Sequence, residues 1–139
     1  NSPTSINHPN FKDDEQSSGS STAAIYCTRP VVLDNPSTAV EIRLTSNVRS
    51  DAEVEVYYRA TSSEEVRDVK DLNWVPFNGD GSEDTTVAPA ESNGDFKEYK
   101  YSASGISEFT AFQIKIAMKG TNSAHAPRIK DLRGIALAV

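Results

Sequence analysis

Apolar and polar residues alternate strictly along several stretches of the chain, which is the pattern of a β-strand with one buried and one solvated face. The clearest stretches are Thr38–Thr45, Glu53–Thr61, Phe96–Ser102 and Ala111–Lys119. We expect two further strands, over residues 24–33 and from about residue 128 to the end of the chain. In the first of these, Arg29-Pro30 predicts a bulge or an edge strand, because proline donates no ladder hydrogen bond.

Clusters of turn-forming residues separate the expected strands. They are rich in Asp, Asn, Ser, Gly and Pro and lie at 34–37, 47–51, 102–105 and 120–127. The longest interruption, Asn78–Asp95, has hardly any apolar residues, and loops of this length are often functional or mobile. No window of about eleven residues has a convincing helical period, and only Ser63–Asp71 fits a single short helix or turn.

Half-polar strands joined by short connections indicate antiparallel sheets. The sequence therefore predicts an all-β fold of two packed antiparallel sheets, a β-sandwich of jelly-roll type. We expect the residues that share one phase to form a single core: Val40, Ile42, Leu44, Val54, Val56, Tyr58, Phe112, Ile114, Ile116, Ile135 and Leu137. Alternate residues of the same strands are expected on solvated outer faces, among them Glu41, Arg43, Tyr57, Arg59, Lys115 and Lys119.

The first part of the chain differs in composition from the rest. Residues 1–22 have Ile6 and Phe11 as their only large apolar residues and end in a run of Ser, Gly and Thr. Such a segment buries too little surface to offset the entropy lost on ordering, so we expect a disordered or linker arm that does not pack on its own domain. The β-sandwich domain is then expected over residues 23–139. Because the chain begins with Asn1, we interpret it as a processed product or an excised piece of a larger protein.

Charge is unevenly distributed along the chain, whose formal net charge is −6. Residues 62–95 hold nine acidic and two basic side chains, whereas residues 96–139 hold seven basic and three acidic ones. This distribution leaves no dominant basic face with aromatic or helical readers, so we expect no nucleic-acid partner. No stretch approaches the roughly 18 apolar residues of a membrane helix, so we expect no membrane partner. Cys27 is the single cysteine, which excludes an intrachain disulfide.

Few residues of the chain could carry catalysis. Its two histidines are His8, in the expected arm, and His125, in a turn, and no serine and acid are spaced to complete a triad. Two distant histidines and one cysteine do not make a zinc site. Cys27 lies in an apolar strand and is interpreted as a small core residue. The carboxylates lie mostly in loops or on solvated strand faces, where we interpret them as surface charge, so we expect no enzyme activity.

The segment Asn78–Asp84 is the one candidate for metal binding. It has oxygen-bearing side chains at alternate positions and two glycines that permit tight turns, which is the kind of loop that binds Ca²⁺. Asp80, Glu83 and Asp84 are the candidate ligands. The segment lacks the ordered spacing of the helix–loop–helix calcium motif, and acidic surface loops are common. We therefore favour a solvated acidic loop and expect no cofactor, with Ca²⁺ as the alternative.

Three residues are candidates for a binding surface. Trp74, the one tryptophan, would stack on a sugar ring if it were exposed, but together with Phe77 it is better interpreted as closing one end of the core. Tyr57 and Arg59 are of the types that contribute most energy at protein–protein interfaces, and the alternation places them on an outer face. The opposite charges of residues 62–95 and of the last third would also let one copy of the chain meet another.

Several segments together resemble a known class of viral protein. They are residues 24–33 with Val40–Asn47, then Val56–Arg59 with Trp74–Phe77, and last Phe109–Thr121 with Pro127–Leu137. These segments are similar to a domain of large virion structural proteins, from the tail, baseplate or fibre of contractile-tailed marine phages that infect cyanobacteria. They also look like discoidin-type, galactose-binding-like sandwiches, many of which bind sugars while many others are purely structural.

The resemblance implies a galactose-binding-like sandwich in a virion assembled in the host cytoplasm, and it implies no ligand residues. Together with the lack of catalytic groups in the sequence, it favours a non-enzymatic structural or assembly module that contacts other virion proteins or copies of itself. The alternative is a carbohydrate-binding module of an adhesin or a polysaccharide-handling protein. Exposed aromatic side chains in a concave patch would favour the sugar binder. A flat apolar patch or an unpaired sheet edge would favour assembly.

Overall fold

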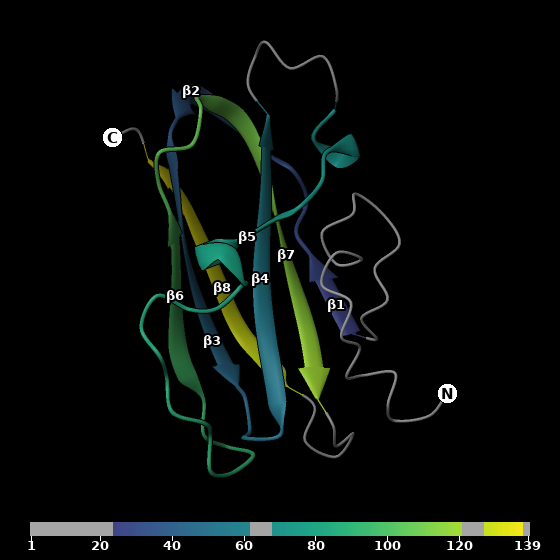
Figure 1. The fold of residues 1–139 in the computed structure, drawn as a ribbon, viewed down its shortest axis with the longest axis vertical. Helices are drawn as coiled ribbons and strands as arrows, with labels where there is room; N and C mark the ends of the chain where they lie inside the picture. Colours follow the sequence, from purple (N-terminus) through teal and green to yellow (C-terminus); the bar gives the residue numbers. More distant parts are fainter. Residues whose placement is uncertain (1–23, 62–67, 121–126, 138–139) are drawn as a thin grey trace.

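The computed structural model describes residues 24–61, 68–120 and 127–137, which form two antiparallel β-sheets packed against each other (Figure 1). The predicted β-sandwich is therefore confirmed. The described strands are β1 (Ala24–Cys27), β2 (Val31–Ser37), β3 (Ala39–Asn47), β4 (Ala52–Thr61), β5 (Val75–Pro76), β6 (Lys97–Ala103), β7 (Phe109–Gly120) and β8 (Arg128–Leu137). The short 3-10 helices η2 (Val69–Asp71) and η3 (Phe77–Gly79) lie between β4 and β6 in the chain. The expected arm, residues 1–22, lies outside the described residues.

The first sheet is built around β7. β4 pairs antiparallel with one edge of β7, from Ala52↔Gly120 to Thr61↔Ala111. β1 and β2 pair in succession with the other edge of β7, and β5 adds a two-residue pairing to β4. The second sheet has the order β6-β3-β8, with β3 in the centre. Because β1 and β2 share one position, the first sheet is four strands wide and the second is three strands wide.

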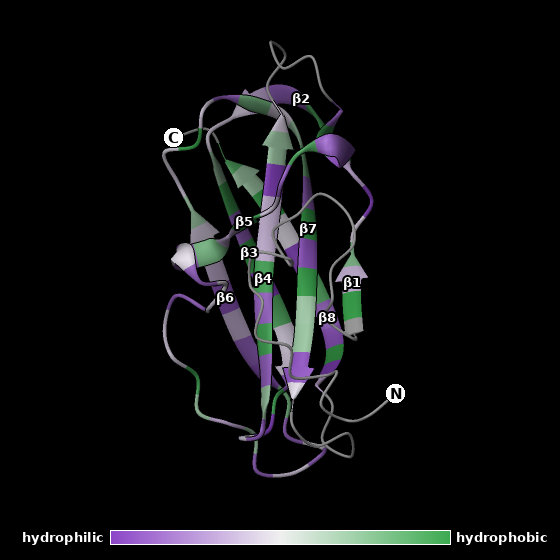
Figure 2. Ribbon diagram, turned by 45° about the vertical axis from the view of Figure 1, so that its right-hand side comes forward, coloured by the Kyte–Doolittle hydropathy of each residue, from purple (hydrophilic) through white to green (hydrophobic). Residues whose placement is uncertain are grey.

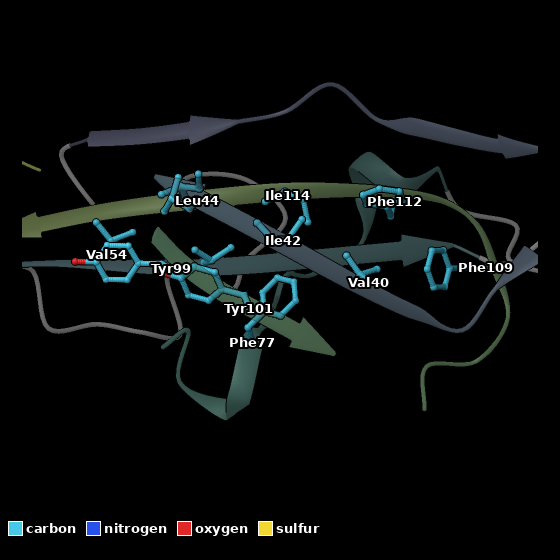
Figure 3. Close-up of a cluster of buried hydrophobic side chains, with 12 residues drawn as sticks. Val40, Ile42, Leu44, Val54, Phe77, Tyr99, Tyr101, Phe109, Phe112 and Ile114 are labelled. Atoms are coloured by element: carbon cyan, nitrogen blue, oxygen red, sulfur yellow. The ribbon is translucent and has the colours of Figure 1, made fainter. Parts of the chain in front are cut away.

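The apolar faces of the two sheets meet in one core (Figure 3). Eight predicted core residues are buried as expected: Val40, Ile42, Leu44, Val54, Val56, Phe112, Ile114 and Ile116. Tyr58 is partly buried and packs against them. The ring of Phe77, in η3, lies 5.0 Å from that of Tyr58 and 6.0 Å from that of Tyr101, measured between centroids. These contacts close the core between β4 and β6.

Ile135 and Leu137 lie outside the core, so their predicted burial is wrong. Their exposed fractions are 52% and 42%. The register of β8 on β3 places Gly134 opposite the core residue Ile42, so Gly134 faces inward and its odd-numbered neighbours face outward. A Cβ added to Gly134 would lie 2.9 Å from Cδ1 of Ile42. The large side chain from β3 thus fills the space beneath β8, and the small residue belongs on the inner face.

The edge made by β1 and β2 agrees with the sequence at one point and differs at another. The predicted interruption at Arg29-Pro30 is confirmed, because both β1 and β2 lie at a sheet edge and the two residues fall between them. The turn expected at residues 34–37 is wrong, since β2 continues to Ser37. Its pairing with β7 shifts register between Val32 and Ser37, so the turn-forming residues are accommodated in an irregular stretch of strand.

Candidate functional site

The outer face of β4 and β7 carries a layer of polar side chains that is buried. Polar and apolar residues alternate along both strands, which Figure 2 shows as bands of contrasting colour. Tyr57, Arg59, Lys115 and Lys119 are predicted to be solvated, but at most 5% of each is exposed, so this prediction is wrong. We call the buried outward residues of the two strands the polar layer: Glu55, Tyr57, Arg59, Gln113, Lys115 and Lys119.

At one end of the polar layer, Glu55 and Lys119 form a buried ion pair. Nζ of Lys119 lies 2.8 Å from Oε1 of Glu55, and the two side chains are 3% and 7% exposed, respectively. The hydroxyl of Tyr57 donates a hydrogen bond of 2.8 Å to the same carboxylate oxygen. Burial of a charge is tolerated when the charge is paired and hydrogen-bonded. This contact therefore ties the beginning of β4 to the end of β7.

At the other end of the polar layer, Arg59 is held from several directions. Its Nε and Nη2 donate hydrogen bonds of 2.9 and 2.6 Å to Oε1 of Gln113. Its Nη1 donates to the carbonyl oxygens of Lys70 and Leu72, in and after η2. The guanidinium carbon lies 4.0 Å from the ring centroid of Trp74, a cation–π contact. Arg59 thereby anchors Lys70, Leu72 and Trp74 onto the outer face of the first sheet.

The three candidate binding residues meet within this layer. Trp74 is 5% exposed and forms a small apolar cluster with Tyr57 and Ala117, while Arg59 lies on its ring. In this arrangement Trp74 has no open face on which a sugar ring could stack. Phe77, its expected companion, lies in the main core instead. The structure thus brings Tyr57, Arg59 and Trp74 together, but as a buried cluster.

Asp84 fastens the acidic loop to β6. Its carboxylate accepts hydrogen bonds from the side-chain amide of Asn78 and from both the backbone NH and the hydroxyl of Ser102. Desolvation acts to raise the pKa of Asp84, but the bonds from Ser102 and Asn78 outweigh it, and the pKa lies below its ordinary value. The carboxylate therefore serves as an ionised link between the loop and a strand.

The other two candidate calcium ligands make separate local bonds. Asp80 accepts hydrogen bonds from the backbone NH and the hydroxyl of Ser82, which close a tight turn. Glu83 accepts one from the backbone NH of Val87. Across residues 24–61, 68–120 and 127–137, no group of three or more His, Cys, Asp or Glu side chains is placed to hold a metal ion. The structure thus does not gather Asp80, Glu83 and Asp84 into one ligand set.

A cavity of about 560 Å³ opens beside the first residues of β4 and the acidic loop. Its walls include Arg49, Glu53, Glu55, Glu83 and Tyr99. Desolvation raises the pKa of Glu53, and a hydrogen bond with Glu55 and the charge of that carboxylate raise it further. The volume lies within the range of small-molecule sites in proteins. The cavity therefore combines polar groups with an aromatic wall.

Exposed large apolar residues concentrate on three edge strands. Seven are exposed in the described part of the chain, and Val75, in β5, is one of them. The other six lie on β1, β2 and β8, and we call these strands the open side: Ile25, Tyr26, Val31, Val32, Ile135 and Leu137. Since η3 packs between β4 and β6, the opposite edge of the second sheet, β8, lies toward β1 and β2. The alternation of apolar and polar residues does not predict this surface, although Arg29-Pro30 indicates one of its edges.

The outer face of the second sheet has a different character, because its charges pair with each other. Arg43 forms ion pairs of 3.1 Å with Glu41 and 3.2 Å with Glu98. Arg133, on β8, lies 3.6 Å from Glu98 and 3.5 Å from Asp131. Exposed pairs of this kind contribute little to stability, roughly 0–1 kcal/mol each. They make this face a solvated surface of alternating charge that ends at the apolar tip of β8.

The residues considered for catalysis give no assembled site in the described structure. His8 and His125 lie outside the described residues. Cys27 is exposed, so its interpretation as a core residue is wrong. Partial burial raises the pKa of its thiol, against the opposite effects of Lys115 and Arg59. A raised pKa lowers the fraction of reactive thiolate at neutral pH.

Comparison of the chain with models of known protein families finds no match, and comparison with curated protein sequences finds none either. In the part of the chain that the structure describes, no helix has the length and apolar character needed to cross a membrane.

Proposed function

We propose that the chain is a non-enzymatic assembly module that acts through protein–protein contact, within a tail, baseplate or fibre protein of a phage particle. The observation that carries the proposal is the open side, whose edge strands hold six of the seven exposed large apolar residues of the described structure. Clustered apolar surface at the edges of sheets is typical of interaction sites, whereas singly scattered apolar residues are ordinary. The virion setting follows from the sequence resemblance alone.

The buried polar layer supports the same function in a different way. Tyr57 donates a hydrogen bond to Glu55, and Arg59 bonds to Gln113 and to backbone carbonyls while it lies on the ring of Trp74, so this cluster rigidifies the first sheet. A rigid sheet holds the edge strands β1 and β2 in a fixed position, which lowers the entropy lost on binding. The chain thus offers a preorganised edge for contact.

Sedimentation velocity of variants tests the proposal. Contact between copies through the outward-facing residues of the open side, Val32 and Ile135, should give association that increases with protein concentration. If charge guides it, this association should weaken as the salt concentration rises from about 50 to about 500 mM. Ile135→Ser and Val32→Ser should reduce this association. Val75→Ser is the matched control, because Val75 is similarly exposed but lies on β5. Equal effects of all three substitutions would argue against the open side.

The alternative function, carbohydrate binding, is favoured by one observation, the cavity beside β4. Carboxylates, Arg49 and Tyr99 line a space of about 560 Å³, and groups of these types bind sugar hydroxyls and ring faces. A glycan array followed by titration calorimetry tests this function. Saturable glycan binding by a strictly monomeric chain, lost in Glu53→Ala but kept in Trp74→Phe, would replace assembly by sugar binding at the cavity.

A further inference from the structure

We infer that an extended segment of a different protein adds as a fourth strand to the second sheet, beside β8, with its apolar side chains beneath β1 and β2. The inference deepens the proposed function and rests on it, because it names what the open side binds. It follows from three features: the uncovered inner face of the first sheet, the edge of β8 and the charge of β8.

The inner face of the first sheet is uncovered at its edge. Tyr26 lies opposite Ile116 and Val31 lies opposite Phe112, and opposed residues in a ladder share a face. Ile116 and Phe112 are buried in the core, whereas Tyr26 and Val31 are 47% and 40% exposed. The second sheet, three strands wide against four, therefore ends before it covers β1 and β2.

β8 is the strand at which the second sheet ends on the open side. Among the strands that the structure describes, β8 pairs with β3 alone, from Ala39↔Leu137 to Asn47↔Arg128. The backbone groups on its other side thus have no ladder partner in the described chain, and such an edge is a template for strand addition. A strand added there would continue the second sheet beneath β1 and β2. It would remove Tyr26 and Val31 from solvent together.

The side chains of β8 define the chemistry of the added strand. In its first six residues, the exposed cations Arg128, Lys130 and Arg133 outnumber the one acid, Asp131. Beyond Arg133 the large exposed side chains, Ile135 and Leu137, are apolar. An antiparallel partner would therefore carry acidic residues in its C-terminal half, beside the cations, and apolar residues on the face turned to the core.

A single segment fits this place better than a second copy of the chain. In each copy, β1 and β2 extend past β8. If two copies paired through their β8 strands about a twofold axis, β1 and β2 of both copies would therefore lie over the new pair of strands. The two edges would compete for the same space. Such pairing would also bring two cation-rich strands together. A lone acidic segment meets neither obstacle.

Peptide binding tests the inference directly. The probe is a capped, labelled decapeptide in which Val alternates with Thr in the N-terminal half and with Glu in the C-terminal half. A second peptide has Lys in place of each Glu. We expect the Glu peptide to bind at least about tenfold more tightly than the Lys peptide in fluorescence anisotropy, and its binding to weaken with salt. Hydrogen exchange should show slower exchange of β8 amides in the complex.

Adjacent residues of β2 provide matched variants. Val31→Lys places a charge on the inner face of the first sheet, where the added strand would contact it. Val32→Lys places a charge on the outer face of the same sheet, because Val32 pairs with Ala111. We expect Val31→Lys to weaken peptide binding at least about tenfold and Val32→Lys to leave it unchanged. Tyr26→Lys and Ile25→Lys form a second such pair, should Val31→Lys fail to fold.

Each other outcome has a defined meaning. The inference is overturned if neither peptide binds, if both bind equally, or if binding does not protect β8. Assembly through the open side is still supported in these cases if Ile135→Ser reduces association. Concentration-dependent protection of β8 in the protein alone makes a second copy the occupant and overturns the assignment to a different protein. Glycan binding by a monomer that binds neither peptide would overturn the proposed function as well.

Discussion

At the scale of single residues, the ion pair between Glu55 and Lys119 decides how firmly β4 and β7 are joined. Removing one partner leaves the other charge buried, which costs about 3–5 kcal/mol. Lys119→Met should therefore lower the free energy of unfolding by about that amount. The double variant Glu55→Gln/Lys119→Met should recover most of the loss, since Tyr57 can still donate to the amide oxygen. Urea unfolding of the unaltered chain, Glu55→Gln, Lys119→Met and the double variant measures the coupling, and strictly additive losses would contradict a buried pair.

The raised pKa of Glu53, on the wall of the cavity, predicts that the stability of the fold depends on pH. Because its pKa is raised in the fold, the folded chain binds this proton more strongly than the unfolded chain, and the ionised carboxylate destabilises the fold. The penalty is absent below the ordinary pKa of Glu and complete above the raised one. Glu53→Gln should thus raise the melting temperature at about pH 7 and leave it unchanged at about pH 3. Glu91→Gln, in an exposed loop position, is the control, and an equal shift at both pH values would refute the prediction.

At the scale of elements, the alternation in the sequence identifies β3, β4 and β7 and the phase of their core residues. It does not show what covers the opposite face. The pattern places Glu55 and Lys119 on a solvated face, because the sequence does not show whether a charged side chain is hydrated or paired with another buried charge. The candidate binding cluster was mistaken for a surface for this reason. Burial of an outward face depends on segments distant in sequence, such as Trp74 over Arg59.

The prediction of which residues of β8 face the core is wrong for a different reason. Large apolar residues in an alternating pattern are assigned to the core, so the pattern places Ile135 and Leu137 on the inner face. In the structure, Ile42 of β3 already fills the space beneath β8. In β8 the small residue Gly134 faces inward and the large residue Ile135 faces outward, which is the opposite of the pattern expected for a buried face. The volume of a facing side chain cannot be known until the sheet order is known, and the order β6-β3-β8 joins strands far apart in the chain.

This packing predicts the effect of enlarging Gly134. Gly134→Val should lower the free energy of unfolding by about 1–3 kcal/mol, because the added atoms overlap Cδ1 of Ile42. In an Ile42→Val background the same substitution should cost less, since the overlapping methyl group is gone. Gly94→Val is the control, because a Cβ at Gly94 meets no atom within 4 Å. Guanidinium unfolding gives the comparison, and an equal cost in both backgrounds would show that the two residues are not in contact.

At the scale of the whole molecule, the sandwich is asymmetric. Its β5 and β6 side is closed by η3, whereas the β1, β2 and β8 side exposes apolar residues. The closed side carries the acidic loop and the cavity, whereas the open side has the edge strands β1, β2 and β8. The two candidate functions, sugar binding and assembly, thus belong to different sides of the molecule. Substitutions on one side can therefore test one function without disturbing the other.

The topology of the whole chain predicts slow folding. Among the described strands, only β4 and β5 are neighbours both in sequence and in a sheet, and they share just two residue pairs, Tyr57↔Pro76 and Tyr58↔Val75. Every other pairing joins distant segments, as Val31↔Phe112 does, so loop closure must be completed before most contacts form. Stopped-flow refolding should give a main phase with a time constant between about 10 ms and several seconds at 25 °C. The seven prolines of the chain can add a slower phase, so refolding after a brief unfolding pulse, which preserves their native isomers, isolates the main one. A main phase faster than about 1 ms would mean that local contacts dominate the transition state, against the sheet order described here.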